Sequence, residues 1–289
     1  MSIRLPDSAT QPSSVSEKRM SRPNGPPGPG GPGGPGGPRP PRRPLPLDVP
    51  VLSTLRTKRV ILASASPRRL TLLSALPLPT LEIIPSTFAE NLDKETLDPF
   101  AYVSQTAMEK TLDVYKREVD KDLLFEGTKG GTGNYERREL GIVIGADTVV
   151  VSPSGQILEK PKSEKEHFAM LQALRDGPHH VLTAICVMAP RDDLRVPGYK
   201  LETHVEDTKV VFDKTMTDEF LWSYVRTREG ADKAGGYAIQ GVGGVLVEGI
   251  EGSWDNVVGL PVRWTLRLIE KVLSPDPDEI GSEDEFFEM

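Results

Sequence analysis

Residues 59–76, RVILASASPRRLTLLSAL, join a short apolar run directly to the start of a helix. Val60 to Ala63 has the length and composition of a buried strand. Ser66 is a residue type favoured at a helix N-cap, and the fixed φ of Pro67 suits the first helical position. We therefore expect a buried strand followed by a helix that begins at Pro67. One face of that helix is apolar and consists of Leu70, Leu73 and Leu76.

Two arginines, Arg68 and Arg69, fall in the first turn of this predicted helix. Helix N-termini carry partial positive charge, so cations there are unfavourable unless an anion binds beside them and the free backbone N–H groups. The stretch therefore predicts an anion site. The alternative is a basic Ser-Pro-Arg-Arg loop that is open to phosphorylation, and this stretch alone leaves both interpretations open.

The strongest strand pattern is GIVIGADTVVV, from Gly141 to Val151, in which the polar residues are Asp147 and Thr148. Burying an unpaired carboxylate costs several kcal/mol. Asp147 therefore needs a cation, a metal ion or a strand-end position that faces solvent; the alternative is a carboxylate that caps a neighbouring helix. The turn residues SPSG after this strand predict a hairpin that brings Lys160 near Asp147.

A helix is predicted from Pro99 to about Val119, with Asp98 as its N-cap. Lys110 lies on its apolar face, so its side chain either snorkels to the rim or points into a cleft. The apolar positions of that face are Val103, Ala107 and Val114.

Strand and helix patterns continue to alternate along the chain, which is typical of an α/β domain. Glycines are concentrated between residues 231 and 261, and they indicate tight turns and close approach of the backbone to a ligand. The further predicted elements are a helix from the capping box of Ser163 and Glu166 to near Gly177, extended segments Val181 to Met188 and Glu202 to Phe212, and helices from about Asp218 to Arg226 and from Pro261 to Leu273.

The two ends differ from the middle of the chain. Eighteen of the 23 residues from Arg22 to Pro44 are Gly or Pro, too few side chains for a core. The last 16 residues contain seven acids and no Lys or Arg. We therefore expect a disordered tail over residues 1–50, one domain over 51–273 with a surface insertion at about 127–138, and an acidic disordered tail over 274–289.

Charge and composition exclude several classes of protein. The acidic tail contributes −7 of the total and residues 1–50 contribute +4, so the body is mildly acidic, which argues against nucleic-acid binding. Cys186 is the only cysteine, so the chain forms no internal disulfide. No apolar stretch approaches 18 residues, so we expect no membrane span and a cytoplasmic location.

Eight polar residues resist explanation as core residues, and together they match what a triphosphate with a divalent metal requires. Arginine and lysine neutralise phosphate charge, carboxylates hold Mg²⁺ or Mn²⁺ through oxygen, and a carboxylate base activates water. Zinc spacing, a G-x-S-x-G motif, a Walker A loop and a dinucleotide-binding glycine motif are all absent. The eight residues are Arg68, Arg69, Glu90, Lys110, Asp147, Lys160, Asp232 and Lys233.

An ordered series of motifs covers roughly Val60 to Val272. The series LASASPRR, AENLD, AMEKT, IGADTVV, ILEKP, HHVLTA, DKAGGYAIQG and NVVGLP resembles the Maf family of nucleoside triphosphate pyrophosphatases. The resemblance implies an inosine-triphosphatase-like (Maf/Ham1-like) α/β fold, in which an elongated mixed sheet with flanking helices forms two lobes around a central cleft. It also implies hydrolysis between the α- and β-phosphates, a divalent metal and a homodimer.

The resemblance also assigns roles to individual residues. It implies that Asp147 is the proton acceptor and, with Glu90, a metal ligand. By the same comparison, Arg68, Thr148 and Gln240 are similar to the residues of relatives that prefer dTTP and UTP; Thr148 and Gln240 both have groups able to hydrogen-bond a pyrimidine edge. The implied phosphate-binding turn is Ser66, Arg68 and Arg69, and the implied cleft lysines are Lys110, Lys160 and Lys233.

Two further hypotheses come from other classes of function. The same cleft would serve a regulatory protein of cell division that senses nucleotides without turning them over. Independently, PRPPRRP at residues 38–44 is a proline-rich segment of the kind bound by SH3-type partners.

Overall fold

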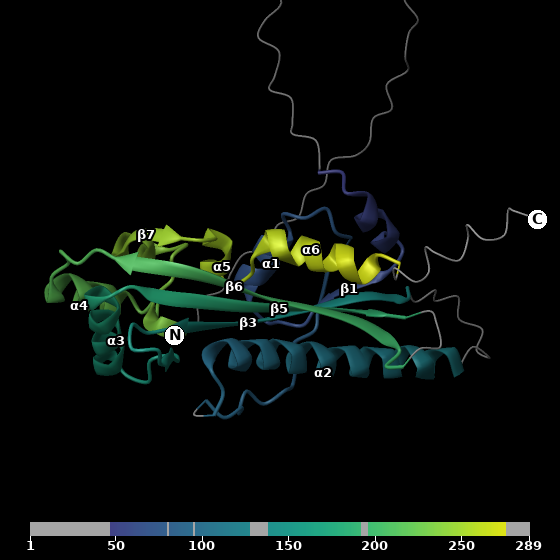
Figure 1. The fold of residues 1–289 in the computed structure, drawn as a ribbon, viewed down its shortest axis with the longest axis horizontal. Coiled ribbons are helices and arrows are strands. Elements are labelled where there is room, and N and C mark those ends of the chain that lie inside the picture. Colours follow the sequence, from purple (N-terminus) through teal and green to yellow (C-terminus); the bar gives the residue numbers. More distant parts are fainter. Residues whose placement is uncertain (1–46, 80, 95, 128–137, 192–195, 276–289) are drawn as a thin grey trace, which may run out of the picture. The chain divides into compact units, whose positions relative to one another are not determined.

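A computed structural model describes residues 47–275 apart from 80, 95, 128–137 and 192–195. These residues form one mixed sheet of seven strands flanked by helices (Figure 1), which confirms the predicted α/β class. In chain order the elements are η1 (Pro50–Leu55), β1 (Arg59–Leu62), α1 (Pro67–Leu73), β2 (Leu81–Ile83), α2 (Pro99–Gly127), β3 (Leu140–Val151), β4 (Ile157–Leu158), α3 (Glu164–Asp176), β5 (His179–Pro190), β6 (Tyr199–Phe212), α4 (Asp218–Thr227), η2 (Ala234–Gly236), η3 (Val242–Leu246), β7 (Val247–Glu251), α5 (Trp254–Val258) and α6 (Val262–Leu273).

The strand order is β2-β1-β3-β5-β6-β7, and β4 also pairs with β3. β1 is parallel to both of its neighbours, and the other pairs are antiparallel. On one edge of β3, β1 pairs only as far as Ile144, and β4 begins to pair at Val150. Within the described residues, positions 145–149 of β3 therefore have no strand partner on that edge. Asp147 and Thr148 lie in this gap.

The sheet lies between helices, with α6 and α1 on one face and α2 on the other (Figure 1). Ile142, Ile144 and Ala146 of β3 pack toward α6 and α1, whereas Val143 and Val149 pack toward α2 on the opposite face. This alternation is the expected period of two along a strand. β3 is buried on both faces, which explains why its sequence is apolar almost throughout.

Gly145 lets α2 approach β3 closely. A Cβ at this position would lie 2.0 Å from the Thr111 hydroxyl oxygen and 3.3 Å from the Ala107 carbonyl oxygen. Thr111 is itself buried and donates its hydroxyl proton to the Ala107 carbonyl. The close approach places the next residue of the helix face, Lys110, beside the gap in β3.

Most of the predicted elements are present. The helix predicted over Pro99 to Val119 is too short, because α2 continues to Gly127. Near the predicted end, Arg59 of β1 binds Glu118 at 2.7 Å and Asp122 at 3.2 Å, so ion pairs hold this part of α2 to the sheet. The carboxylate of Asp98 accepts the N–H groups of the next turn, as predicted.

Other predictions about the ends and loops have different outcomes. α1 does begin at Pro67, but the Ser66 hydroxyl makes no capping hydrogen bond. The insertion at 127–138 and both tails fall almost wholly outside the described residues, so disorder there and an SH3-type partner stay predictions. None of the helices in the described part of the chain has both the length and the apolar composition needed to cross a membrane.

His179 fastens the glycine-rich segment to the sheet. It is fully buried at the start of β5, and its Nε2 lies 2.9 Å from the Tyr237 hydroxyl oxygen. Burial, helped by the neighbouring charge of His180, lowers the pKa of His179 to about 3. The folded protein therefore holds this imidazole neutral.

Adding a methyl group at Gly145 should destabilise the protein. We expect Gly145→Ala to lower the free energy of unfolding by about 2 kcal/mol, because the buried Thr111 side chain has to move. Gly249→Ala is the matched control, since a Cβ there would have nothing within 4 Å of it, and a change below about 0.5 kcal/mol is expected. Urea denaturation measures both; equal effects would contradict the close approach of α2.

Protonation of His179 should make the fold acid-sensitive. Between its ordinary pKa of 6.5 and its folded pKa of about 3, the unfolded chain binds a proton that the folded protein does not, so stability falls as the pH falls. The expected loss from pH 7 to pH 5 is about 2 kcal/mol. Urea denaturation at each pH tests this, and His179→Gln should remove most of the loss. If the His179→Gln variant keeps the full pH dependence, groups other than His179 cause the loss of stability.

Candidate active site

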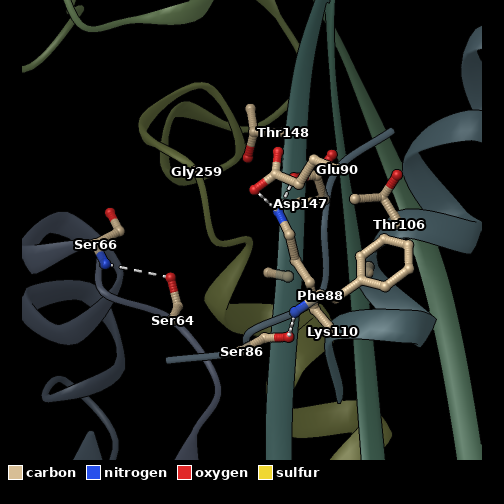
Figure 2. A network of polar contacts seen from close by, with 12 residues as sticks. Ser64, Ser66, Ser86, Phe88, Glu90, Thr106, Lys110, Asp147, Thr148 and Gly259 are labelled. Carbon is tan, nitrogen blue, oxygen red and sulfur yellow. Dashed lines mark hydrogen bonds and ion pairs between the residues drawn. The ribbon is translucent and has the colours of Figure 1, made fainter. Parts of the chain in front are cut away.

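Lys110 of α2 joins two carboxylates at the gap in β3. Its Nζ lies 2.7 Å from Oδ1 of Asp147 and 2.7 Å from Oε1 of Glu90. The side chains of Lys110 and Asp147 are 11% and 10% exposed, whereas that of Glu90 is 58% exposed. Figure 2 shows the three groups pointing toward one another. The cation that Asp147 was predicted to need is therefore Lys110, which points inward and does not snorkel to the rim.

Glu90 is placed by a loop that α2 also holds. Asp113 of α2 accepts hydrogen bonds from the Ser86 hydroxyl at 2.7 Å and from the Thr87 N–H at 2.8 Å. Burial raises the pKa of Asp113, but these hydrogen bonds outweigh it and lower the pKa below its ordinary value. An ionised Asp113 thus fixes the chain four residues before Glu90.

Arg69 occupies the gap from the other side. Its Nη1 donates to the Ala146 carbonyl at 2.8 Å and to Ser64 at 3.2 Å, its Nη2 donates to Thr148 at 3.0 Å, and its Nε donates to the Gly259 carbonyl at 2.9 Å. The Ala146 carbonyl is one that a further strand would otherwise pair. Arg69, predicted to bind phosphate, therefore replaces a missing strand and positions the residues on either side of Asp147.

The hydroxyl of Thr148 is part of a chain of hydrogen bonds. It accepts from Arg69 and lies 3.0 Å from the Thr183 hydroxyl, which donates to the Asn256 carbonyl at 3.0 Å. Since the proton of Thr183 is used there, Thr148 donates its own proton to Thr183. Protein partners therefore use the proton and one of the two lone pairs of the Thr148 hydroxyl, which leaves one acceptor site for the predicted contact with a pyrimidine.

Arg68 is a partly buried cation with few compensating contacts. Its Nε is buried and has no hydrogen-bond partner among the described residues. Burial lowers the pKa of Arg68, and the charge of Asp232 opposes this shift. Arg69 likewise has its pKa lowered by burial and by Arg68, with the charges of Asp147 and Glu90 opposing. Within the described part of the chain, these two adjacent guanidinium groups thus lack a direct carboxylate partner, an arrangement that an anionic ligand would complete.

Further cations lie along the same side. Lys233 pairs with Asp232, the carboxylate that acts on Arg68, and is 17% exposed. The Gly235 N–H donates to the Glu159 carbonyl at 3.3 Å, which ties this segment to the chain beside Lys160. Lys233 is thus connected to Arg68 through Asp232, and Lys160 lies next to a residue that is bonded to the same segment.

The structure does not bring every predicted residue into direct contact. Lys160 and Gln240 are exposed and have no hydrogen bond or ion pair within the described part of the chain. Ser66 lies apart from the group around Asp147 (Figure 2); its N–H donates to the Ser64 hydroxyl at 3.3 Å and its carbonyl accepts the Leu70 N–H at 3.3 Å, but its hydroxyl makes no capping hydrogen bond. The roles predicted for these three residues stay predictions.

Several residues that support the site were not among those predicted from the sequence. Ser64, Thr183 and the carbonyl of Gly259 all take part in holding Arg69 or Thr148. Ser64 and Gly259 lie inside LASASPRR and NVVGLP, so the motifs were the available signal for these two. Thr183 likewise lies inside HHVLTA, whereas Asp113 lies in an ordinary helix pattern that carries no such signal.

The donor set fits a hard divalent cation. Among the described residues no three His, Cys, Asp or Glu side chains converge. Glu90 and Asp147 nevertheless lie close enough to share one cation, since Lys110 contacts both. Mg²⁺ in proteins is commonly held by one or two carboxylates, with waters and phosphate oxygens completing the shell.

Comparison with known proteins agrees with this chemistry. Residues 59–272 match the family model described as Maf-like protein. The dTTP/UTP pyrophosphatase of Schizosaccharomyces pombe is 43% identical over 222 residues, covering 76% of this chain and 86% of that protein. The dTTP/UTP pyrophosphatase of a Thermoanaerobacter species is 39% identical over 213 residues, covering 74% and 96%.

A human relative differs in length. It is named probable bifunctional dTTP/UTP pyrophosphatase/methyltransferase protein and is 39% identical over 237 residues. The match covers 80% of this chain but only 35% of the human protein. The similarity to that protein therefore concerns about a third of its length.

Replacing Lys110 should show how much an unpaired, buried Asp147 carboxylate destabilises the fold. We expect Lys110→Met to lower the free energy of unfolding by about 3 kcal/mol at neutral pH, because Asp147 loses its partner while it stays buried. Adding Asp147→Asn to this variant should restore most of the loss, since the buried side chain that lost its partner is then neutral. Urea denaturation of the two single variants and the double variant measures the coupling. Additive losses would show that the two side chains do not form the pair described.

Proposed function

This chain belongs to the Maf-like protein family, and on that premise we propose that it hydrolyses nucleoside triphosphates to the monophosphate and pyrophosphate. The observation that carries the proposal is the site at the gap in β3. There a buried carboxylate, Asp147, lies beside Lys110, Glu90 and two arginines that have no carboxylate partner among the described residues. The names of the relatives add dTTP and UTP as the substrates.

Arg68 is the first candidate for contact with the triphosphate. A buried guanidinium nitrogen without a partner gains most from an anionic acceptor, and arginine binds phosphate through two parallel hydrogen bonds. Lys233 is released to a phosphate oxygen if its exposed partner Asp232 turns to solvent. Lys160, two residues after β4, adds an exposed positive charge.

Asp147 serves as the base in the proposed reaction. A water oxygen forms a bond to the α-phosphorus while the bond from that phosphorus to the bridging oxygen breaks, and pyrophosphate leaves with the bonding electrons. The proton of the water moves to a carboxylate oxygen of Asp147 and then to solvent. Lys110 balances the charge of Asp147 before this step, and Arg69 fixes the strand that carries it.

We further propose that Glu90 and Asp147 hold Mg²⁺ or Mn²⁺. Their carboxylate oxygens are the donors that such cations prefer, and both lie at one point now bridged by Lys110. When bound, a divalent cation supplies positive charge for the phosphates and increases the acidity of water. The Lys110 ammonium then moves to a phosphate oxygen or stays on one of the two carboxylates.

Gln240 is the residue that we propose for recognition of the base. Its exposed amide has one acceptor and two donors with no protein partner in the described residues, so it is free to match the edge of uracil or thymine. Thr148 is the weaker candidate, because its hydroxyl already joins Arg69 to Thr183.

A panel of nucleoside triphosphates with and without Mg²⁺, Mn²⁺ and a chelator tests the proposal. We expect pyrophosphate release from dTTP and UTP that the chelator abolishes. Binding without release from any nucleotide would instead support the regulatory nucleotide sensor, which the names of the relatives do not favour. Release of inorganic phosphate and a nucleoside diphosphate would contradict cleavage between the α- and β-phosphates.

Replacing the base should reduce turnover without weakening substrate binding. At saturating Mg²⁺, we expect Asp147→Asn to lower kcat by about 100-fold or more, with KM for dTTP within about threefold of the wild-type value. Asp176→Asn, the same change at an exposed position, should retain full activity. Steady-state kinetics with pyrophosphate detection measures both, and an active Asp147→Asn protein would rule out this residue as the base.

A further inference from the structure

Residues 238–243, the Gln240 loop, form a closed turn with Gln240 at its exposed tip. The Gly241 N–H donates to the Ala238 carbonyl at 3.1 Å. A Cβ at Gly243 would lie 2.7 Å from the same carbonyl oxygen, so only glycine allows the end of the loop to lie against its start. The loop therefore presents one polar side chain, and the backbone around it determines where that side chain points.

Glu229 binds this backbone with both carboxylate oxygens. Its Oε1 accepts the Val242 N–H at 2.9 Å, and its Oε2 accepts the Gly243 N–H at 2.7 Å. A Cβ at Gly241 would lie only 2.0 Å from Oε1. The carboxylate thus lies flat against the loop, with no side chain between them.

Tyr224 extends the contact to the other end of the loop. Its hydroxyl donates to Oε2 of Glu229 at 3.0 Å and lies 3.3 Å from the Ala238 N–H, which donates to it. The Tyr224 ring is buried in α4. Both ends of the Gln240 loop are therefore fixed by one carboxylate and one hydroxyl, and the hydroxyl is anchored in the core.

The charge of Glu229 is maintained in this position. Burial raises the pKa of Glu229, but the hydrogen bonds from Gly243, Val242 and Tyr224 and the charge of Lys233 outweigh it and lower the pKa below its ordinary value. The two backbone bonds are therefore charge-assisted and about twice as strong as bonds between neutral groups.

The turn that carries Glu229 also carries Lys233. The Lys233 N–H donates to the Gly230 carbonyl at 3.1 Å, and Gly230 packs against the Gly236 carbonyl so closely that a Cβ would lie 1.9 Å from its oxygen. This turn is thus rigidly attached to the glycine-rich segment. It holds the anchor of the Gln240 loop and a candidate phosphate-binding lysine four residues apart.

We propose that Glu229 is a positioning residue for nucleobase selection, which fixes the Gln240 loop at a set place relative to the phosphate-binding side of the site. The proposal rests on the proposed function, in which Gln240 contacts the base. Glu229 itself does not touch the nucleotide. Its carboxylate is needed because only an ionised acceptor with two oxygens satisfies two adjacent N–H groups together with the Tyr224 hydroxyl.

Glu229→Gln tests this role directly. The substitution keeps the size of the side chain but replaces one acceptor by a donor that faces an N–H group. We expect KM for UTP to rise about 10-fold, kcat to stay within about threefold, and the kcat/KM preference for UTP over CTP to fall about 10-fold. A residue that only stabilised the fold would leave the preference between bases unchanged.

Two further variants complete the test. Tyr224→Phe should lower the preference for UTP over CTP as well, but by less than Glu229→Gln does. If Glu229→Gln does not fold, Tyr224→Phe replaces it in the test. Glu248→Gln, the same chemical change at an exposed position on β7, should leave both constants and the preference at wild-type values. Thermal melting identifies any variant that is lost through unfolding.

The outcomes separate this proposal from the proposed function. A wild-type protein that releases no pyrophosphate overturns both. An active wild-type protein with unchanged base preference in Glu229→Gln, or in Tyr224→Phe if the first variant does not fold, overturns the positioning role alone. A fall in kcat with unchanged KM and preference does the same, because it would place Glu229 in the chemical step.

Discussion

The gap in β3 is the constraint on which the rest of the site depends. Polar backbone groups in a buried strand need partners, and β1 and β4 together leave the edge of residues 145–149 without a strand among the described residues. Arg69 supplies a side-chain donor for the Ala146 carbonyl, and α2 supplies Lys110 for Asp147. The interrupted sheet thereby leaves room for Arg69 beside the strand that carries Asp147, the partner carboxylate of Lys110.

Local rules identified Asp147 but could not choose its partner. A carboxylate inside an apolar strand is conspicuous in a sequence, because burial without a cation is costly. Lys110 is 37 positions away, and helix spacing alone allowed it to point to the rim or inward. The choice is made by Gly145, which brings α2 close to β3, and no feature of either segment alone reveals that contact.

The two arginines show that a shared charge pattern does not give two residues the same contacts. Both were expected to bind phosphate, since two cations at a helix start need an anion. The structure gives Arg69 four neutral protein acceptors and leaves Arg68 with a buried nitrogen that has none among the described residues. Two adjacent residues with the same charge thus make different contacts, and the difference follows from the backbone geometry after β1. The turns of the glycine-rich segment were predicted correctly, because they do need glycine. Glu229, which anchors this segment, was not predicted, because nothing in the sequence marks its turn.

The most direct test of the central claim is a crystal structure of the protein with α,β-methylene-dTTP, an analogue that is not cleaved between the α- and β-phosphates. We predict that the triphosphate contacts Arg68, that the α-phosphorus lies beside Asp147 at the gap in β3, and that the base lies at the Gln240 loop. A triphosphate bound elsewhere, with the gap in β3 still closed by protein side chains alone, would contradict the assignment of this gap as the active site.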